Sequence, residues 1–81
     1  MREQRRRQDA IELFGLVIKE KRLQRALSQE DLASRLSMDR AHLSLLENGK
    51  KQPTLSTIFN LCSELGLEVS TVFAEVEQLL A

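Results

Sequence analysis

Tryptophan and tyrosine are absent from this 81-residue sequence, which also has a single proline, a single cysteine and only three glycines. With so few residues that interrupt helices, and with 42% hydrophobic residues, the composition favours short linked helices over sheet or disorder. The lone Cys62 has no partner for an internal disulfide, and its apolar setting in IFNLCSEL indicates a buried thiol in a reducing compartment. We expect a single all-α domain over residues 1–81, too small for a second core or a deep cleft.

The residue combinations that enzymes need are also scarce. The sequence has one histidine, no glycine-rich phosphate loop and no cluster of metal ligands. We therefore expect no enzyme activity, no metal site, no cofactor and no small-molecule ligand. In the basic N-terminus, MREQRRRQDAIELFGLVIKEKR, charges interrupt the apolar residues, so we expect neither a signal peptide nor a membrane span, and a cytoplasmic location.

The net charge of the sequence is zero, but its charged residues are distributed unevenly. The twelve basic and twelve acidic residues cancel, but residues 1–25 carry eight Arg or Lys against four acids, and residues 61–81 carry four glutamates and no basic residue. One end of the molecule can therefore face an anion and the other cannot. The basic run at residues 5–7 has two interpretations, an arm along a nucleic-acid backbone or the solvated start of a helix.

Apolar spacing predicts five helices, over about residues 9–25, 29–35, 40–48, 55–65 and 71–80. Ser28 with Asp31 resembles a capping box at the start of the second helix. Further caps are predicted at Asp39 and Ser70, and glycine stops at Gly49 and Gly66. One face of the fourth helix carries Leu55, Ile58, Leu61, Cys62 and Leu65.

The second and third helices have the proportions of a helix-turn-helix, over about residues 28–48. Two short helices are separated by about four residues, the position that faces their crossing is the small Ala33, and the buried side of the third helix is Leu43 and Leu46. This arrangement predicts a protein that places its third helix in a groove of DNA.

The fifth helix is apolar over more of its surface than one contact with its own core would need. Because it stands at the end of the chain, we expect part of this face to meet another copy. The alternative is an amphipathic tail that packs back on its own domain. The expected dimer-interface residues are Val72, Val76, Leu79 and Leu80.

Three segments in order, LSQEDLA, LLENGKKQP and LGLEVSTVF, carry a resemblance to a known family. Residues 14–73 resemble the helix-turn-helix domain of the Cro/C1 type, also called the XRE family. The resemblance implies a five-helix lambda-repressor-like domain that dimerises on an inverted-repeat operator and regulates transcription in a prokaryotic or phage setting, near the nucleoid. Short controller proteins of restriction–modification systems look closest, because they too carry an Asp-Arg pair that opens the third helix.

The resemblance also implies roles for single residues. Arg40 corresponds to a base-reading position at the start of the third helix, and Arg22 corresponds to a structural partner of Glu47. That pairing is physically reasonable, since a carboxylate in the last turn of a helix is disfavoured by the helix dipole. The residues implied to contact phosphates are Ser28, Gln29, Asn48, Lys50 and Lys51.

Helical geometry places Ala41, Ser44, Leu45 and Asn48 on the outward face of the third helix. Ala41 and Leu45 are suited to thymine methyl groups, whereas an arginine such as Arg40 suits guanine. A face with so few polar groups predicts a large share of shape-based readout. Asp39 and His42 are further candidates for DNA contact.

The sequence departs from the family at Ala26 and Ser37, where glycine is common. If either position needs a positive φ, the side chain costs on the order of 1 kcal/mol.

Two functions from different classes remain open. The first is a homodimeric, sequence-specific regulator of transcription that binds double-stranded DNA, with RNA polymerase or another protein as a further candidate partner. The alternative is a protein-interaction module on the same fold, such as an antitoxin that binds a toxin through its apolar tail.

Overall fold

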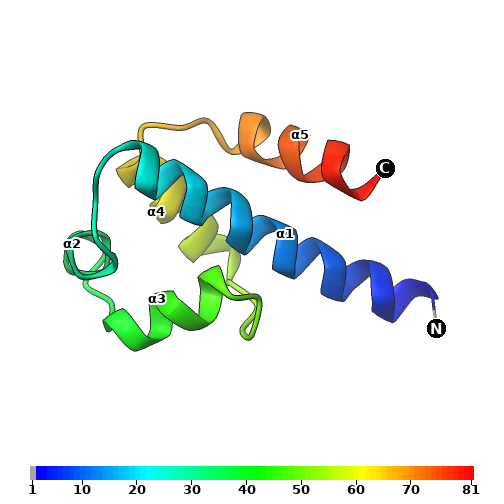
Figure 1. Cartoon of the computed structure of the whole chain (residues 1–81), viewed down its shortest axis with the longest axis horizontal. Coiled ribbons are helices and arrows are strands. Elements are labelled where there is room, and N and C mark those ends of the chain that lie inside the picture. Colours follow the sequence, from blue (N-terminus) through cyan, green and yellow to red (C-terminus); the bar gives the residue numbers. More distant parts are fainter. Residues whose placement is uncertain (1) are drawn as a thin grey trace.

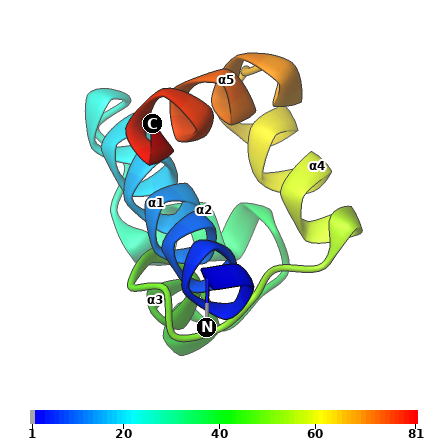
Figure 2. The same ribbon diagram turned by 90° about the vertical axis from the view of Figure 1, so that its right-hand side faces the viewer.

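The computed structural model describes residues 2–81, with side chains from residue 6 onward. In this range the chain forms five helices and no strand: α1 (Arg2–Gln24), α2 (Gln29–Arg35), α3 (Arg40–Glu47), α4 (Leu55–Glu64) and α5 (Val69–Leu80). The predicted all-α, five-helix class is confirmed. Helix α1 crosses the molecule, with α5 beside it on one side and the α2–α3 pair on the other, while α4 closes the interior opposite α1 (Figures 1 and 2).

The core lies between these helices, and each helix contributes to it. Burying a Leu, Ile or Val side chain completely stabilises the fold by about 1.5–3 kcal/mol. As expected, Ala33 and Cys62 are buried, and burial raises the pKa of the Cys62 thiol. The core side chains with 1% exposure or less include Val17, Ile18, Leu32, Leu43, Leu61, Leu65 and Val72.

Helix α1 starts seven residues earlier than predicted, at Arg2 rather than at residue 9. The apolar pattern begins only at Ile11, but Arg, Glu and Gln in residues 2–8 are good helix formers. The extension is tied to the rest of the fold where Gln8 Nε2 donates to the carbonyl oxygen of Gly49 at 3.1 Å. Of the basic run at 5–7, Arg6 and Arg7 are exposed, and the side chain of Arg5 lies outside those described.

The caps agree with the sequence in part. The Ser28–Asp31 capping box is confirmed: Asp31 N donates to Ser28 Oγ at 3.0 Å, and Ser28 N donates to Asp31 Oδ2 at 3.1 Å. The backbone amide of Ser28, and to a smaller extent the Ser28 hydroxyl, lowers the pKa of the Asp31 carboxyl group.

The other two predicted caps fare differently. Asp39 occupies the cap position of α3 as predicted, but its side chain makes no capping hydrogen bond. The cap predicted at Ser70 is wrong. Ser70 lies inside α5, which begins at Val69 because the carbonyl oxygen of Glu68 already accepts from Thr71 and Val72. Val69 also packs against the core.

Ala26 and Ser37 have positive φ, at 55° and 54°, in turns that end α1 and α2. The backbone still closes both turns, since Leu27 N donates to Arg22 O at 3.2 Å and Met38 N donates to Ala33 O at 2.9 Å. A side chain in this region costs on the order of 1 kcal/mol relative to glycine. The predicted stops at Gly49 and Gly66 have φ of 70° and 67° and are confirmed.

Candidate nucleic-acid interface

Helix α3 presents one exposed face away from the core. Arg40, Ala41, Leu45 and Asn48 are exposed, with Leu45 at 45%, and Ser44 is half-buried. Leu43, Leu46 and Glu47 are buried on the opposite side. This division matches the face expected from the 100° helical step, so the apolar Leu45 does lie on the exposed face of α3.

The rear of α3 approaches α1 closely at Gly15. A Cβ atom at this position would collide with the backbone carbonyl oxygens of Leu46 and Glu47. Glycine is therefore required here for space rather than for conformation, and the contact places the last turn of α3 directly against α1. The sequence pattern alone did not indicate this requirement at Gly15.

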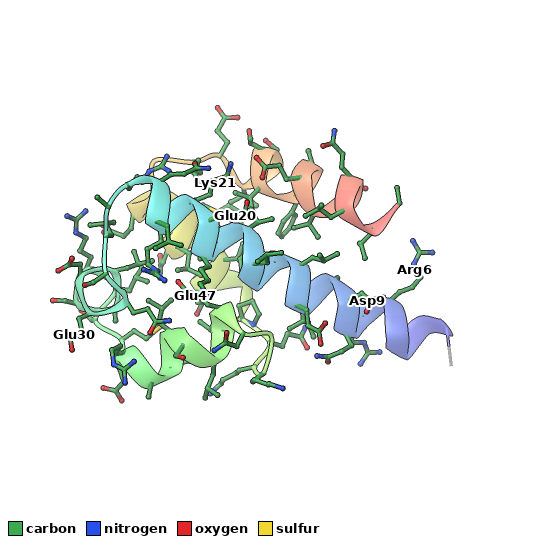
Figure 3. The ribbon with its side chains drawn as sticks, in the orientation of Figure 1. Arg6, Asp9, Glu20, Lys21, Glu30 and Glu47 are labelled. Carbon is green, nitrogen blue, oxygen red and sulfur yellow. The ribbon has the colours of Figure 1, made fainter. Side chains whose placement is uncertain are left out.

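The implied Arg22–Glu47 ion pair is present. Arg22 Nε donates to Glu47 Oε2 at 2.7 Å and Arg22 Nη2 donates to Glu47 Oε1 at 3.0 Å. Arg22 Nη1 also donates to the carbonyl oxygen of Leu27 at 2.8 Å. The two residues are only 5% and 4% exposed, and Figure 3 shows Glu47 between α1 and α3. The pair joins three segments of the fold and does not face a ligand.

Gln29 extends this ion pair to the surface. Its Nε2 donates to Glu47 Oε1 at 2.9 Å, and its Oε1 accepts from Arg40 Nη1 at 3.2 Å. Arg22, Glu47, Gln29 and Arg40 therefore form one continuous chain of hydrogen bonds from α1 to the start of α3. Nothing in the sequence predicts this link, because it depends on how α2 and α3 cross.

The other residues expected at phosphates are all exposed. Ser28 is exposed, and its Oγ accepts from the Asp31 backbone amide at 3.0 Å. Asn48 is exposed and its Nδ2 donates to Ser44 Oγ at 3.4 Å. Lys50 and Lys51 follow Gly49 and are exposed.

Asp39 and His42 have different surroundings. Asp39 is exposed beside Arg40. His42 is half-buried and lines a hollow of about 190 Å³ with residues of the α2–α3 turn and of α4. The structure therefore does not bring His42 together with the exposed face of α3.

The expected dimer interface needs a correction. Val72 is fully buried and Val76 is 7% exposed, because both pack in the core, so neither is open to a second copy. Leu79 is 54% exposed and Leu80 is half-buried.

An apolar surface that was not predicted from the sequence lies over α4. Leu55, predicted on the inward face, is 69% exposed because it stands at the first position of α4, and Phe59 one turn later is 55% exposed. Beside them a groove of about 510 Å³ opens between α1, α4 and α5. Its lining includes Ile11, Phe14, Pro53, Ile58 and Phe73, with Arg7 and Glu77 at its charged positions.

The described residues form neither a metal-binding cluster nor a membrane-spanning helix. No group of three or more His, Cys, Asp or Glu side chains is placed to hold a metal ion. No helix in this part of the chain has the length and apolar character needed to cross a membrane.

A short helix capped by Ser28, a tight turn and a second helix with one exposed face, all seated on α1 by a buried ion pair, define a helix-turn-helix protein. The helix-turn-helix family HTH_3 matches residues 18–72. The chain belongs to this family.

Individual relatives support this assignment. The chain is 33% identical to the control protein C.MunI of a Mycoplasma species, over 80% of this chain and 89% of that protein. It is 32% identical to the restriction–modification controller protein C.AhdI from Aeromonas hydrophila, over 78% of this chain and 96% of that chain, with a TM-score of 0.74. It is 25% identical to the clp gene regulator ClgR from C. glutamicum, over 89% and 94% of the two chains, with a TM-score of 0.83.

Proposed function

We propose that the protein is a sequence-specific DNA-binding regulator of transcription that inserts α3 into the major groove. The observation that carries this proposal is the exposed face of α3, held rigidly from behind by the Arg22–Glu47 pair and flanked by hydrogen-bond donors and lysines. A rigid helix with one open face is the geometry by which helix-turn-helix proteins read base edges. In this proposal the protein binds DNA and catalyses no reaction, and it acts in the cytoplasm as a single domain.

The residues divide between two tasks. Arg40 reads guanine through two parallel hydrogen bonds, while Ala41 and Leu45 contact thymine methyl groups and Ser44 lies between them. The backbone contacts position the helix without reading sequence. They come from Ser28, Gln29, Asn48, Lys50 and Lys51.

The zero net charge is compatible with this function. Affinity for DNA depends on the phosphates that local Lys and Arg neutralise, not on the charge of the whole molecule. Lys50 and Lys51 lie beside the end of α3, whereas the acidic residues after position 61 belong to α4, α5 and the turn between them. The two lysines therefore belong to a different segment of the fold from these glutamates.

We further propose that the apolar groove beside Phe59 receives a second copy of the chain. Gln52 and Pro53 of the α3–α4 loop help to line the groove, so it lies near the end of α3. A two-fold axis there leaves both α3 helices free to reach successive major grooves, about 34–36 Å apart. Arg7 and Glu77 provide opposite charges that such an axis can bring together.

The biological setting that we favour is control of a restriction–modification system. C.AhdI is named as a restriction–modification controller protein and C.MunI as a control protein. The matches cover 96% and 89% of those two proteins. In this setting the operator is an inverted repeat near the genes that the protein regulates.

Selection of bound duplexes from a random DNA pool tests the proposal. The expected result is an enriched inverted repeat whose half-sites lie about one helical turn apart, with the protein dimeric in sedimentation. Failure to enrich any sequence would contradict the proposal and favour a protein-interaction module, for which the exposed Leu55, Phe59 and Leu79 would form the docking residues.

A further inference from the structure

We propose that Gln29 is a positioning residue for base recognition: it holds the Arg40 guanidinium against α2 and so determines part of the sequence preference. This inference rests on the proposed function of Arg40. It assigns to Gln29 a role in specificity in addition to the phosphate contact that the family resemblance implies.

The anchor of the arrangement is Glu47. Its side chain has no exposed surface, and its Oε2 accepts from Arg22 Nε at 2.7 Å. Its Oε1 accepts from Arg22 Nη2 at 3.0 Å and from Gln29 Nε2 at 2.9 Å. Because three donors converge on a buried carboxylate, its position is determined by the core of the protein and not by solvent.

The orientation of the Gln29 amide follows from its neighbours. A carboxylate can only accept hydrogen bonds, so Gln29 must turn its NH₂ group toward Glu47. Its carbonyl oxygen then faces Arg40, whose guanidinium can only donate. The opposite orientation would set two acceptors against each other at Glu47 and two donors against each other at Arg40. Both contacts therefore select the same orientation.

The hydrogen bond to Gln29 restricts the Arg40 side chain, which is long and exposed and would otherwise adopt many rotamers. The hydrogen bond from its Nη1 to Gln29 Oε1, at 3.2 Å, limits that freedom before DNA is bound. It leaves the Nε–Nη2 edge of the guanidinium available for the O6 and N7 atoms of guanine. Preorganisation of this kind improves binding to the correct base, while a disordered arginine can still contact phosphates nonspecifically.

The second N–H of the Gln29 amide is not used within the chain of hydrogen bonds, so a phosphate contact is compatible with this role. The two roles differ in what they change. Loss of a phosphate contact weakens binding to every sequence equally, whereas loss of Arg40 positioning weakens binding to the preferred sequence most.

The test is a double-mutant cycle on the ratio of two affinities. The probes are the duplex selected from the random pool and a scrambled duplex of the same composition. The variants are Gln29→Ala, Arg40→Ala and both together, with Gln24→Ala as a matched control at an exposed glutamine of α1. Partial unfolding lowers both affinities by the same factor, so the ratio reports recognition even if a variant is less stable.

We expect Arg40→Ala to lower the ratio by about tenfold or more, the range for a bidentate guanine contact. Gln29→Ala is expected to lower it by about two- to tenfold, the range for one hydrogen bond. The double variant should equal Arg40→Ala alone, because Gln29 acts through Arg40. Gln29→Asn, one methylene shorter, should resemble Gln29→Ala, and Gln24→Ala should not change the ratio.

Two results would overturn the inference while the proposed function stands: an unchanged ratio in Gln29→Ala, or independent, multiplying effects of the two substitutions. If Arg40→Ala leaves the ratio unchanged, the assignment of Arg40 fails and the role of Gln29 fails with it. If the wild-type protein binds neither duplex, the proposed function itself is wrong. These outcomes are distinguishable within one set of measurements.

Discussion

Arg22 and Glu47 connect α1 to the last turn of α3 through an ion pair that is closed to solvent. The Arg22 Nε to Glu47 Oε2 distance is 2.7 Å, and the two side chains are 6% and 0% exposed. Removing one member of a buried ion pair is strongly destabilising, because the remaining charge is then buried without a partner. The pair therefore ties the position of the reading helix to the stability of the whole domain.

The first prediction concerns this pair. Glu47→Ala should lower the free energy of unfolding by about 3–5 kcal/mol, because Arg22 is left buried and unpaired. Urea denaturation followed by circular dichroism measures the change. The double variant Arg22→Met with Glu47→Leu is the control, and it should recover most of the loss because no buried charge remains. A Glu47→Ala protein as stable as the wild type would contradict this account.

The second prediction uses the two turns with positive φ. Ala26→Gly and Ser37→Gly should each raise the free energy of unfolding, by up to about 1 kcal/mol, since glycine relieves the left-handed strain. The gains should add, because the turns are separate. Ala74→Gly, in the exposed interior of α5, is the control and should lower stability by about 0.5–1 kcal/mol. Stability that falls in all three variants would show that neither turn is strained.

These turns also show how far the sequence could be interpreted without coordinates. The family resemblance identified Ala26 and Ser37 as positions where glycine is common, and the capping box at Ser28 gave the start of α2 correctly. Local signals of this kind act between neighbouring residues, so they can be recognised in the sequence. The same signals failed at Ser70, because α5 starts where Val69 meets the core.

Apart from the Arg22–Glu47 pair, which the family resemblance implied, contacts between helices were beyond prediction. The Gln29–Arg40 hydrogen bond and the need for glycine at position 15 arise from how α1, α2 and α3 cross. Val72 and Val76 were placed at a dimer interface for a related reason: apolar spacing shows that a helix face is hydrophobic but not whether it meets its own core or another chain. Val72 and Val76 meet the core, whereas Phe59 remains open.

The third prediction concerns pH. The Ser28 amide lowers the pKa of Asp31 below 3.8, so the folded state favours the ionised carboxylate. Its contribution to stability is present above about pH 4 and is lost as the pH falls through the lowered pKa. The melting temperature of Asp31→Asn should therefore lie below that of the wild type at neutral pH, and the gap should narrow in acid. Glu30→Gln, in the same turn, should show a smaller gap at neutral pH.

The fourth prediction concerns the lysines after α3. Each phosphate contact that is lost should make the slope of log affinity against log salt shallower by about 0.9. Lys50→Ala and Lys51→Ala should both have this effect, and they should weaken binding to the selected and scrambled duplexes equally because phosphates carry no sequence information. Lys19→Ala, an exposed lysine of α1, is the control. An unchanged salt slope in both variants would remove these residues from the interface.

The fifth prediction concerns the apolar groove. Phe59 follows the groove residue Ile58 in α4 and is 55% exposed, so Phe59→Glu places a charge next to the groove without disturbing the core. The wild type should sediment as a dimer and this variant as a monomer, because two carboxylates would be desolvated at the contact. Leu23→Glu is a matched control, since Leu23 is 56% exposed at the opposite end of α1 from the groove residues Arg7 and Ile11.

Because a monomer engages only one half-site at a time, Phe59→Glu should also lose affinity for the full inverted repeat while its affinity for a single half-site is preserved. A Phe59→Glu protein that remains dimeric would place the dimer contact elsewhere on the molecule.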